Sequence, residues 1–78
     1  MATNSASPNL QYVVTFSGPT GKADKVYPIG FTPIIPRIGE KLSGKDGDME
    51  VTDVIHELGT VDGSDILVAR ITLKLKIL

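Results

Sequence analysis

The chain has 78 residues, no cysteine, one histidine and a formal net charge of −1. These values exclude disulfides and thiolate zinc sites, leave nothing for a His-rich metal cluster, and are not those of a general polyanion binder. A single domain of this size has a marginal core and usually needs a disulfide, a metal or self-association, so we expect a homo-oligomer, with a dimer favoured, and no metal or cofactor.

The first residues, MATNSASPN, are small and polar and show no periodicity. We expect residues 1–9 to be a disordered tail and residues 10–78 to form a single small β domain. The N-terminus shows neither the basic nor the apolar region of a signal peptide, and the apolar runs are short and interrupted by charge. We therefore expect a cytoplasmic protein without a membrane span.

The first predicted strand covers residues 10–17, with the sequence LQYVVTFS. Its apolar residues alternate, which predicts one buried face and one less buried face. The buried-looking face carries Leu10, Tyr12, Val14 and Phe16. The sequence GPTG at 18–21 predicts a reversal, because proline and glycine supply the dihedrals that a turn needs. Residues 22–29 then return as a shorter strand that ends near Pro28.

The next segment, PIGFTPIIPRIG at 28–39, combines prolines with large apolar residues. Proline removes a ladder donor, so the segment cannot be a central strand. It is nevertheless more apolar than a solvated loop, through Ile29, Phe31, Ile34, Ile35 and Ile38. We expect this loop either to plug the end of the sheet or to contact a partner, and the sequence leaves both alternatives open.

Two further β segments follow the loop. Residues 40–44 offer a brief strand, and KDGD at 45–48 turns the chain. In MEVTDVIHEL at 49–58 the apolar alternation changes parity, which predicts a β-bulge near Thr52–Asp53. The pair Asp62-Gly63 is a hairpin turn sequence.

The last segment, ILVARITLKLKIL at 66–78, is the clearest predicted strand. One face is continuously apolar and carries Leu67, Ala69, Ile71, Leu73, Leu75 and Ile77. Thirteen residues would span roughly 43 Å at about 3.3 Å per residue, which is longer than a usual strand. A strand of this length must bend around a barrel or run on to pair with another subunit.

Three stretches suggest chemistry, and each has a simpler interpretation. SGPTGKAD contains the Gly-Lys pair of a phosphate-binding loop, but Phe16 and Ala23 occupy positions that require other residues. DGDMEVTDVIHE spaces acids like a calcium loop, but Val51 stands where glycine makes the turn. No nucleophile is linked to His56 by spacing, and we expect His56 on the less buried face of its strand. We therefore expect no enzyme and no catalytic residue.

A basic stripe formed by Arg70, Lys74 and Lys76 gives one alternative function, nucleic-acid binding. Only four aromatic residues are present in the chain, and two of them lie on the buried-looking face of the first strand. The stripe therefore lacks the platforms on which bases stack. Nucleic-acid binding is a candidate function that the sequence does not favour.

The loop gives the favoured interpretation, a preorganised contact surface for a protein partner, because proline lowers the cost of ordering it. The candidate partner-binding residues are Tyr27, Ile29, Phe31, Ile34, Ile35 and Arg37. A further alternative is a small-molecule pocket at a subunit interface, capped by the same loop. The identity of the partner is not encoded in any motif that we find.

The segments IPRIGEKL and VTDVIHEL, followed by a long final strand, resemble the layout of SH3-like small barrels over about 36–75. Short uncharacterised proteins of phages and other mobile elements often look similar. The resemblance implies a curled antiparallel barrel that binds rather than transforms its ligand. We accordingly expect an all-β fold, a small barrel or sandwich of five or six strands.

Overall fold

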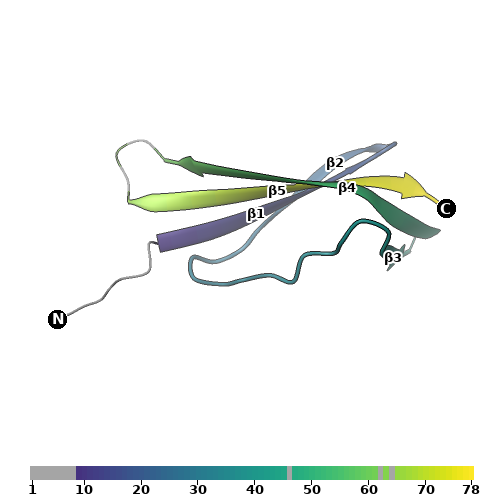
Figure 1. Ribbon diagram of the computed structural model, residues 1–78, viewed down its shortest axis with the longest axis horizontal. Helices are drawn as coiled ribbons and strands as arrows, with labels where there is room; N and C mark the ends of the chain where they lie inside the picture. The colour runs from purple at the N-terminus through teal and green to yellow at the C-terminus, as the bar shows by residue number, and fades with distance from the viewer. Residues whose placement is uncertain (1–8, 46, 62, 64) are drawn as a thin grey trace.

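The computed structural model describes residues 9–45, 47–61, 63 and 65–78. Over these residues the chain forms five strands and no helix, which confirms the predicted all-β class (Figure 1). The strands are β1 (Asn9–Gly18), β2 (Gly21–Val26), β3 (Lys41–Gly44), β4 (Gly47–Thr60) and β5 (Ile66–Ile77). Asn9 begins β1, and the rest of the tail expected over 1–9 lies outside the described residues.

The five strands form one curled sheet, a half-barrel, in the order β2-β1-β5-β4-β3. Three neighbouring pairs are antiparallel, as predicted, but β1 and β5 pair in parallel. The parallel pair arises because the segment between β2 and β3 carries the chain from one edge of the sheet to the other. The sheet is therefore mixed, which differs from the purely antiparallel arrangement expected.

The register aligns Val14 with Ile71 and Phe16 with Leu73, which confirms the predicted faces, but Val13 and Thr15 on the other face of β1 are buried as well. The apolar faces of the two strands thus lie on the same side of the sheet. The buried cluster on this side consists of Val14, Val51, Ile71 and Leu73, with Tyr12, Phe16, Tyr27, Ile35, Leu42, Val54 and Leu75 packed against it. We call this side the inner face.

The predicted bulge in β4 is present. Val51 pairs with Leu75, and Asp53 pairs with Lys74, so Thr52 is the additional residue. The Thr52 hydroxyl donates to the carbonyl of Lys74 (3.1 Å), and the Asp53 carboxylate accepts from the Val54 N–H (2.9 Å). The bulge keeps both Val51 and Val54 on the inner face.

The long strand β5 lies between β1 and β4 over most of its length. Its residues from Ile66 to Lys74 pair with β1, and those from Leu67 to Ile77 pair with β4. Of the two expectations for a strand of this length, bending with the sheet is confirmed. β5 does not run past its own domain.

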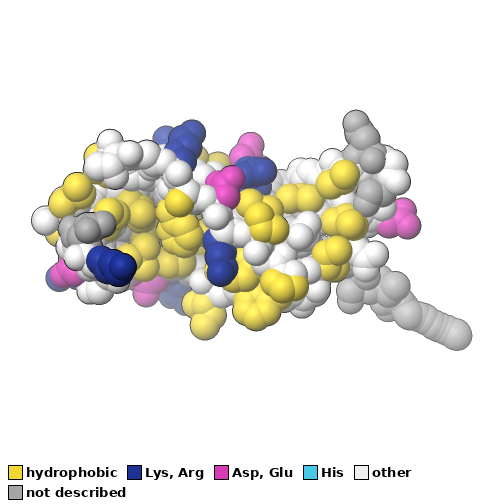
Figure 2. All heavy atoms as spheres, turned by 180° about the vertical axis from the view of Figure 1, so that it is seen from behind, with side chains coloured by type: hydrophobic (Ala, Val, Ile, Leu, Met, Phe, Trp, Pro, Cys, Tyr) yellow, Lys and Arg dark blue, Asp and Glu magenta, His cyan; other side chains and the backbone are white. Residues whose placement is uncertain are grey.

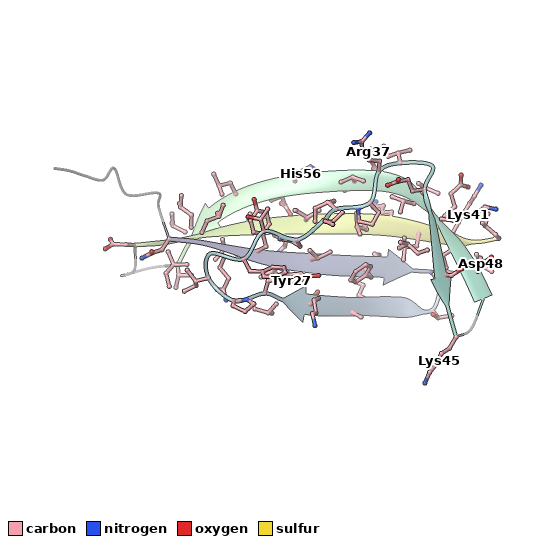
Figure 3. All side chains as sticks on the ribbon, turned by 90° about the horizontal axis from the view of Figure 1, so that it is seen from below. Tyr27, Arg37, Lys41, Lys45, Asp48 and His56 are labelled. Carbon is pink, nitrogen blue, oxygen red and sulfur yellow. The ribbon has the colours of Figure 1, made fainter. Side chains whose placement is uncertain are left out.

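Residues 27–40 cross the inner face from β1 to β4 (Figures 1 and 3). The segment begins beside β1, where the Tyr27 N–H donates to the carbonyl of Tyr12 (3.0 Å). It ends beside β4, where the Gly39 N–H donates to the carbonyl of Val51 (2.8 Å). The prolines lie in this crossing, away from the sheet ladders. We call residues 27–38 the crossing loop.

Candidate functional site

The crossing loop divides its apolar side chains between the core and the surface. Pro33 is buried, and Tyr27, Ile35 and Pro36 are half-buried. The exposed side chains are Ile34 (96% exposed), Ile38 (63%), Ile29 (50%) and Phe31 (50%). The loop therefore covers the core on its inner side and exposes an apolar surface on its outer side, and contact of that surface with a partner stays a prediction.

Phe31 is held in place although half of its surface is exposed. Its ring stacks on Tyr27 with 5.2 Å between centroids and 4° between planes. The Phe31 N–H donates to the carbonyl of Pro28 (3.0 Å), closing a turn in which Gly30 adopts a positive φ of 87°. The Lys25 ammonium lies 5.8 Å from the centre of the Tyr27 ring. These contacts preorganise an exposed aromatic side chain.

The far end of the loop is fixed by a tight turn at Arg37. The Arg37 N–H donates to the Glu40 carboxylate (2.6 Å), and the Glu40 N–H donates to the carbonyl of Arg37 (3.0 Å). Gly39 has a φ of 91°, which glycine adopts without steric cost. The Arg37 side chain is exposed at the rim of the loop surface, near β4 (Figure 3).

An open groove lies between the end of the loop and β4. Its volume is about 420 Å³, and its lining is Ile35, Pro36, Arg37, Ile38, Val54 and His56. The register aligns His56 with Ile71, which places it on the inner face. The expectation that His56 lies on the less buried face is therefore wrong, although its side chain remains exposed. His56 shares the parity of Val54 and Leu58 beyond the predicted bulge, so the alternation of β4 itself places it with these apolar residues.

Hydrophobic side chains are visible across much of the molecular surface in Figure 2. Some protrude along the lower margin, the side on which Figure 1 places the crossing loop. Ile34 contributes most to this surface, because almost none of its side chain contacts the protein. The molecule thus exposes an apolar surface on a rigid loop.

The basic stripe lies on the opposite face of the sheet, which we call the outer face. Each of its cations stands opposite an acid of β4: Arg70 opposite Glu57, Lys74 opposite Asp53, and Lys76 opposite Glu50. The Lys76 ammonium lies 3.2 Å from the Glu50 carboxylate. The stripe therefore faces acids of the neighbouring strand along its whole length.

Arg70 is further tied to the other side of the sheet. Its guanidinium donates to the hydroxyl of Thr15 (3.4 Å) and lies 4.0 Å from the Asp24 carboxylate. The Thr15 hydroxyl in turn donates to Asp24 (2.8 Å). Thr15 is buried, so these contacts satisfy a polar group that would otherwise be costly to bury. Arg70 therefore has a structural role on the outer face.

The described residues contain no group of three or more His, Asp or Glu side chains arranged to hold a metal ion. Asp46, the first position of the calcium-like spacing, lies outside them. Lys22, from the phosphate-loop-like sequence, lies in β2 and is followed by strand rather than helix. Among the described residues no helix is long and apolar enough to cross a membrane.

Sequence reasoning missed two parts of this surface. Pro33 is the buried anchor of the loop, but it is followed by isoleucine just as the exposed Pro28 is, and this context does not distinguish the two. Val54 and His56 form one wall of the groove, and no sequence signal connects them to the loop. Their proximity depends on the path of the loop over the sheet.

Comparison of the chain with protein-family models, curated proteins and solved structures gives no match.

Proposed function

We propose that the protein is a non-catalytic binding module that self-associates and contacts a protein partner through the crossing loop. The observation that carries this proposal is the set of four large apolar side chains that the loop exposes, led by Ile34 at 96% exposed. The contact residues are Tyr27, Ile29, Phe31, Ile34, Ile35 and Arg37. Tyr27 and Ile35 support the surface from below, and Arg37 lies at its rim.

Energetics support a binding role for this surface. Burying one large aliphatic or aromatic side chain stabilises a complex by about 1.5–3 kcal/mol. Ile34 and Phe31 would each contribute a term of this order if a partner covered them. Because the Tyr27–Phe31 stack and the turn at Arg37 already fix the loop, little ordering entropy is lost on binding.

The small size of the core supports self-association. Within the described residues, five aliphatic side chains are buried besides Pro33: Val13, Val14, Val51, Ile71 and Leu73. A domain with so few buried side chains is marginal on its own. Covering further apolar surface with a second copy adds the stabilisation that disulfides or metals supply in other small proteins.

The resemblance to SH3-like small barrels, and to short proteins of phages and mobile elements, supports binding rather than catalysis. A cytoplasmic location belongs to the same proposal. Beside His56, no nucleophilic side chain lines the groove. The groove therefore fits an apolar contact better than a hydrolytic site.

The proposal is tested by placing charge on the exposed loop. We expect Phe31→Asp/Ile34→Asp to lower the molar mass measured by light scattering, because carboxylates cannot be buried in an apolar contact. The monomer should stay folded, since Ile34 is 96% exposed, Phe31 is half exposed, and neither belongs to the buried cluster. Thr32→Asp, which adds a charge to the same exposed loop, is the matched control. An unchanged mass for the double variant would contradict the loop contact.

The groove supports the small-molecule alternative as a second candidate. Its volume falls within the range of ligand pockets, and four of its six lining residues are apolar. A thermal-shift screen with a metabolite library would detect such a ligand, because binding to the native state raises the melting temperature. The nucleic-acid alternative is weakened by the acids that face each cation of the stripe.

A further inference from the structure

One long edge of the sheet has no strand beside it. β3 pairs with β4 over residues 47–50, and Val51 makes the next contacts, with Gly39 and Glu40. From 52 to 60, β4 has β5 on one side and, within the described part of the chain, no strand on the other. Backbone N–H and C=O groups on such an edge are available to another strand.

The hydrogen bonds at the two ends of this edge identify the residues that face outward. The Val61 N–H donates to the carbonyl of Ile66, toward β5 (3.4 Å). The Val54 N–H is instead taken up by the Asp53 carboxylate. Antiparallel pairing alternates along a strand, so alternate residues from Val54 onward direct their backbone groups to the open edge. These residues are Val54, His56, Leu58 and Thr60.

The side chains of the same residues lie on the inner face, where apolar surface is exposed. Leu58 is 69% exposed, and Ile38 of the neighbouring loop is 63% exposed. A strand added at this edge would cover both and close the groove. The opposite edge of the sheet, β2, differs because it carries Lys22 and Lys25, and edge lysines discourage strand pairing.

We propose that a second copy of this chain occupies the open edge, its β4 pairing antiparallel with β4 about a two-fold axis at His56. The open stretch 52–60 has its midpoint at His56, so in this register the open edges of both copies begin and end together. The interface uses the same surface on both copies and closes as a dimer. This inference rests on the self-association in the proposed function and assigns it to an edge distinct from the loop surface.

The charges of β4 favour this register over its neighbours. With the axis at His56, Val54 stands opposite Leu58 of the second copy, and Asp53 stands opposite Gly59. With the axis at Ile55, Asp53 would stand opposite Glu57 of the second copy. With the axis at Glu57, this residue would stand opposite Glu57 of the second copy. Like charges directly opposite each other destabilise a strand pair. The register centred on His56 alone among the three avoids this repulsion.

Single-cysteine variants test the register, because the chain has no cysteine of its own. Directly opposite residues in a hydrogen-bonded antiparallel pair have Cα atoms about 5.5 Å apart, which is within the disulfide range of about 4.4–6.8 Å. We expect His56→Cys, under mild oxidation at micromolar concentration, to shift on a non-reducing gel from the 8.3 kDa monomer to a covalent dimer. Ile55→Cys and Glu57→Cys, whose side chains point to the outer face, should remain monomeric on the gel.

A second pair of variants keeps the test decisive if His56→Cys fails to fold. Val54→Cys mixed with Leu58→Cys should form the mixed disulfide, while neither alone should cross-link. Equal cross-linking at 55, 56 and 57 would overturn the proposal, because it would indicate random collisions. With the loop contact removed by Phe31→Asp/Ile34→Asp, masses that still grow beyond the dimer with concentration would overturn it too, because they would indicate open-ended pairing of β4 with β2 of the next copy.

The edge and the loop surface can fail separately. Added to the His56→Cys variant, Leu58→Lys should abolish the cross-link. Val26→Lys, on the opposite edge of the sheet, should leave the cross-link intact. Phe31→Asp/Ile34→Asp should also leave it intact. If the cross-link is specific to the expected positions and the loop variant leaves the molar mass unchanged, the pairing of β4 edges is supported and the loop contact is rejected. If the loop variant has a lower molar mass and no specific cross-link forms, the loop contact is supported and the pairing of β4 edges is overturned.

Discussion

Leu73 is completely buried and lies at the centre of the inner face. Its neighbours across the sheet are Phe16 of β1 and Val54 of β4. Because the domain has few other fully buried side chains, the contacts of this one leucine carry a large share of the packing energy. Residues at the edges of the same face, such as Leu58, contribute little to the isolated chain.

We expect Leu73→Ala to lower the free energy of unfolding by about 2–5 kcal/mol, through lost transfer energy and a cavity. Urea unfolding followed by circular dichroism, at one fixed chain concentration, measures this change. Leu78→Ala is the control: Leu78 is 55% exposed, and a surface substitution should change stability by less than about 0.5 kcal/mol. Equal effects of the two variants would show that Leu73 does not hold the core.

The limits of sequence reasoning are clearest at Ile34 and Ile35. The two residues are adjacent and identical in type, yet Ile34 is 96% exposed and Ile35 packs against the core. No period of 2 or 3.6 governs a proline-containing loop, so alternation could not tell which isoleucine points outward. The composition predicted an unusually apolar loop, and only the path of the backbone assigns each side chain to the core or to the surface.

Among the elements, β4 and β5 were the most predictable. The unbroken alternation of β5 predicted its faces, and the parity change in β4 predicted the bulge at Thr52. Both features depend on local side-chain periodicity, which a single sequence contains. The parallel pairing of β1 with β5 was not predictable in this way, because it depends on where the crossing loop delivers the chain.

The bulge allows a specific prediction about β4. Deleting Thr52 should leave the protein folded with cooperative unfolding, because Val51 and Val54 keep their faces without the additional residue. We expect a loss of about 1 kcal/mol from the missing hydrogen bond to Lys74. Chemical denaturation with a fluorescent or circular-dichroism probe would measure the difference.

Deleting Ile55 is the matched control for this change. That deletion would turn Leu58 to the outer face and Glu57 to the inner face, because a shift of one residue reverses every side chain of a strand that follows. We expect this variant to unfold at a much lower denaturant concentration than the Thr52 deletion. Similar midpoints for the two deletions would show that Thr52 is not the additional residue.

At the scale of the whole molecule, the charge is balanced across the sheet rather than along the chain. The acids of β4 and the cations of β5 form separate groups along the sequence, but the register places them opposite each other. The sequence therefore suggested a basic stripe, whereas the folded protein presents paired opposite charges. A strand-by-strand count of charges cannot show this, because the pairing register is a property of the fold.

We expect the wild-type protein to cause no shift of labelled single-stranded DNA at low salt, because each cation of the stripe faces an acid. Glu50→Gln/Asp53→Asn/Glu57→Gln should uncover the stripe and produce binding that weakens steeply as salt rises. Electrophoretic shift at several salt concentrations measures both. Salt-dependent binding by the wild-type protein would contradict the neutralisation and revive the nucleic-acid alternative.

The parallel pairing of β1 with β5 has a consequence for how the chain reaches its native state. β1 and β2 are joined by a short connection, as are β4 and β5, so each of these pairs can form early. The pairing of β1 with β5 instead joins the first and the last strand of the sequence. During synthesis, the backbone groups on one side of β1 stay unpaired until β5 has left the ribosome. Pairing of β1 with β5 closes the longest loop and so has the largest entropic cost. We therefore expect this pairing to limit the folding rate, and the unpaired edge of β1 to be most prone to incorrect strand pairing before it forms.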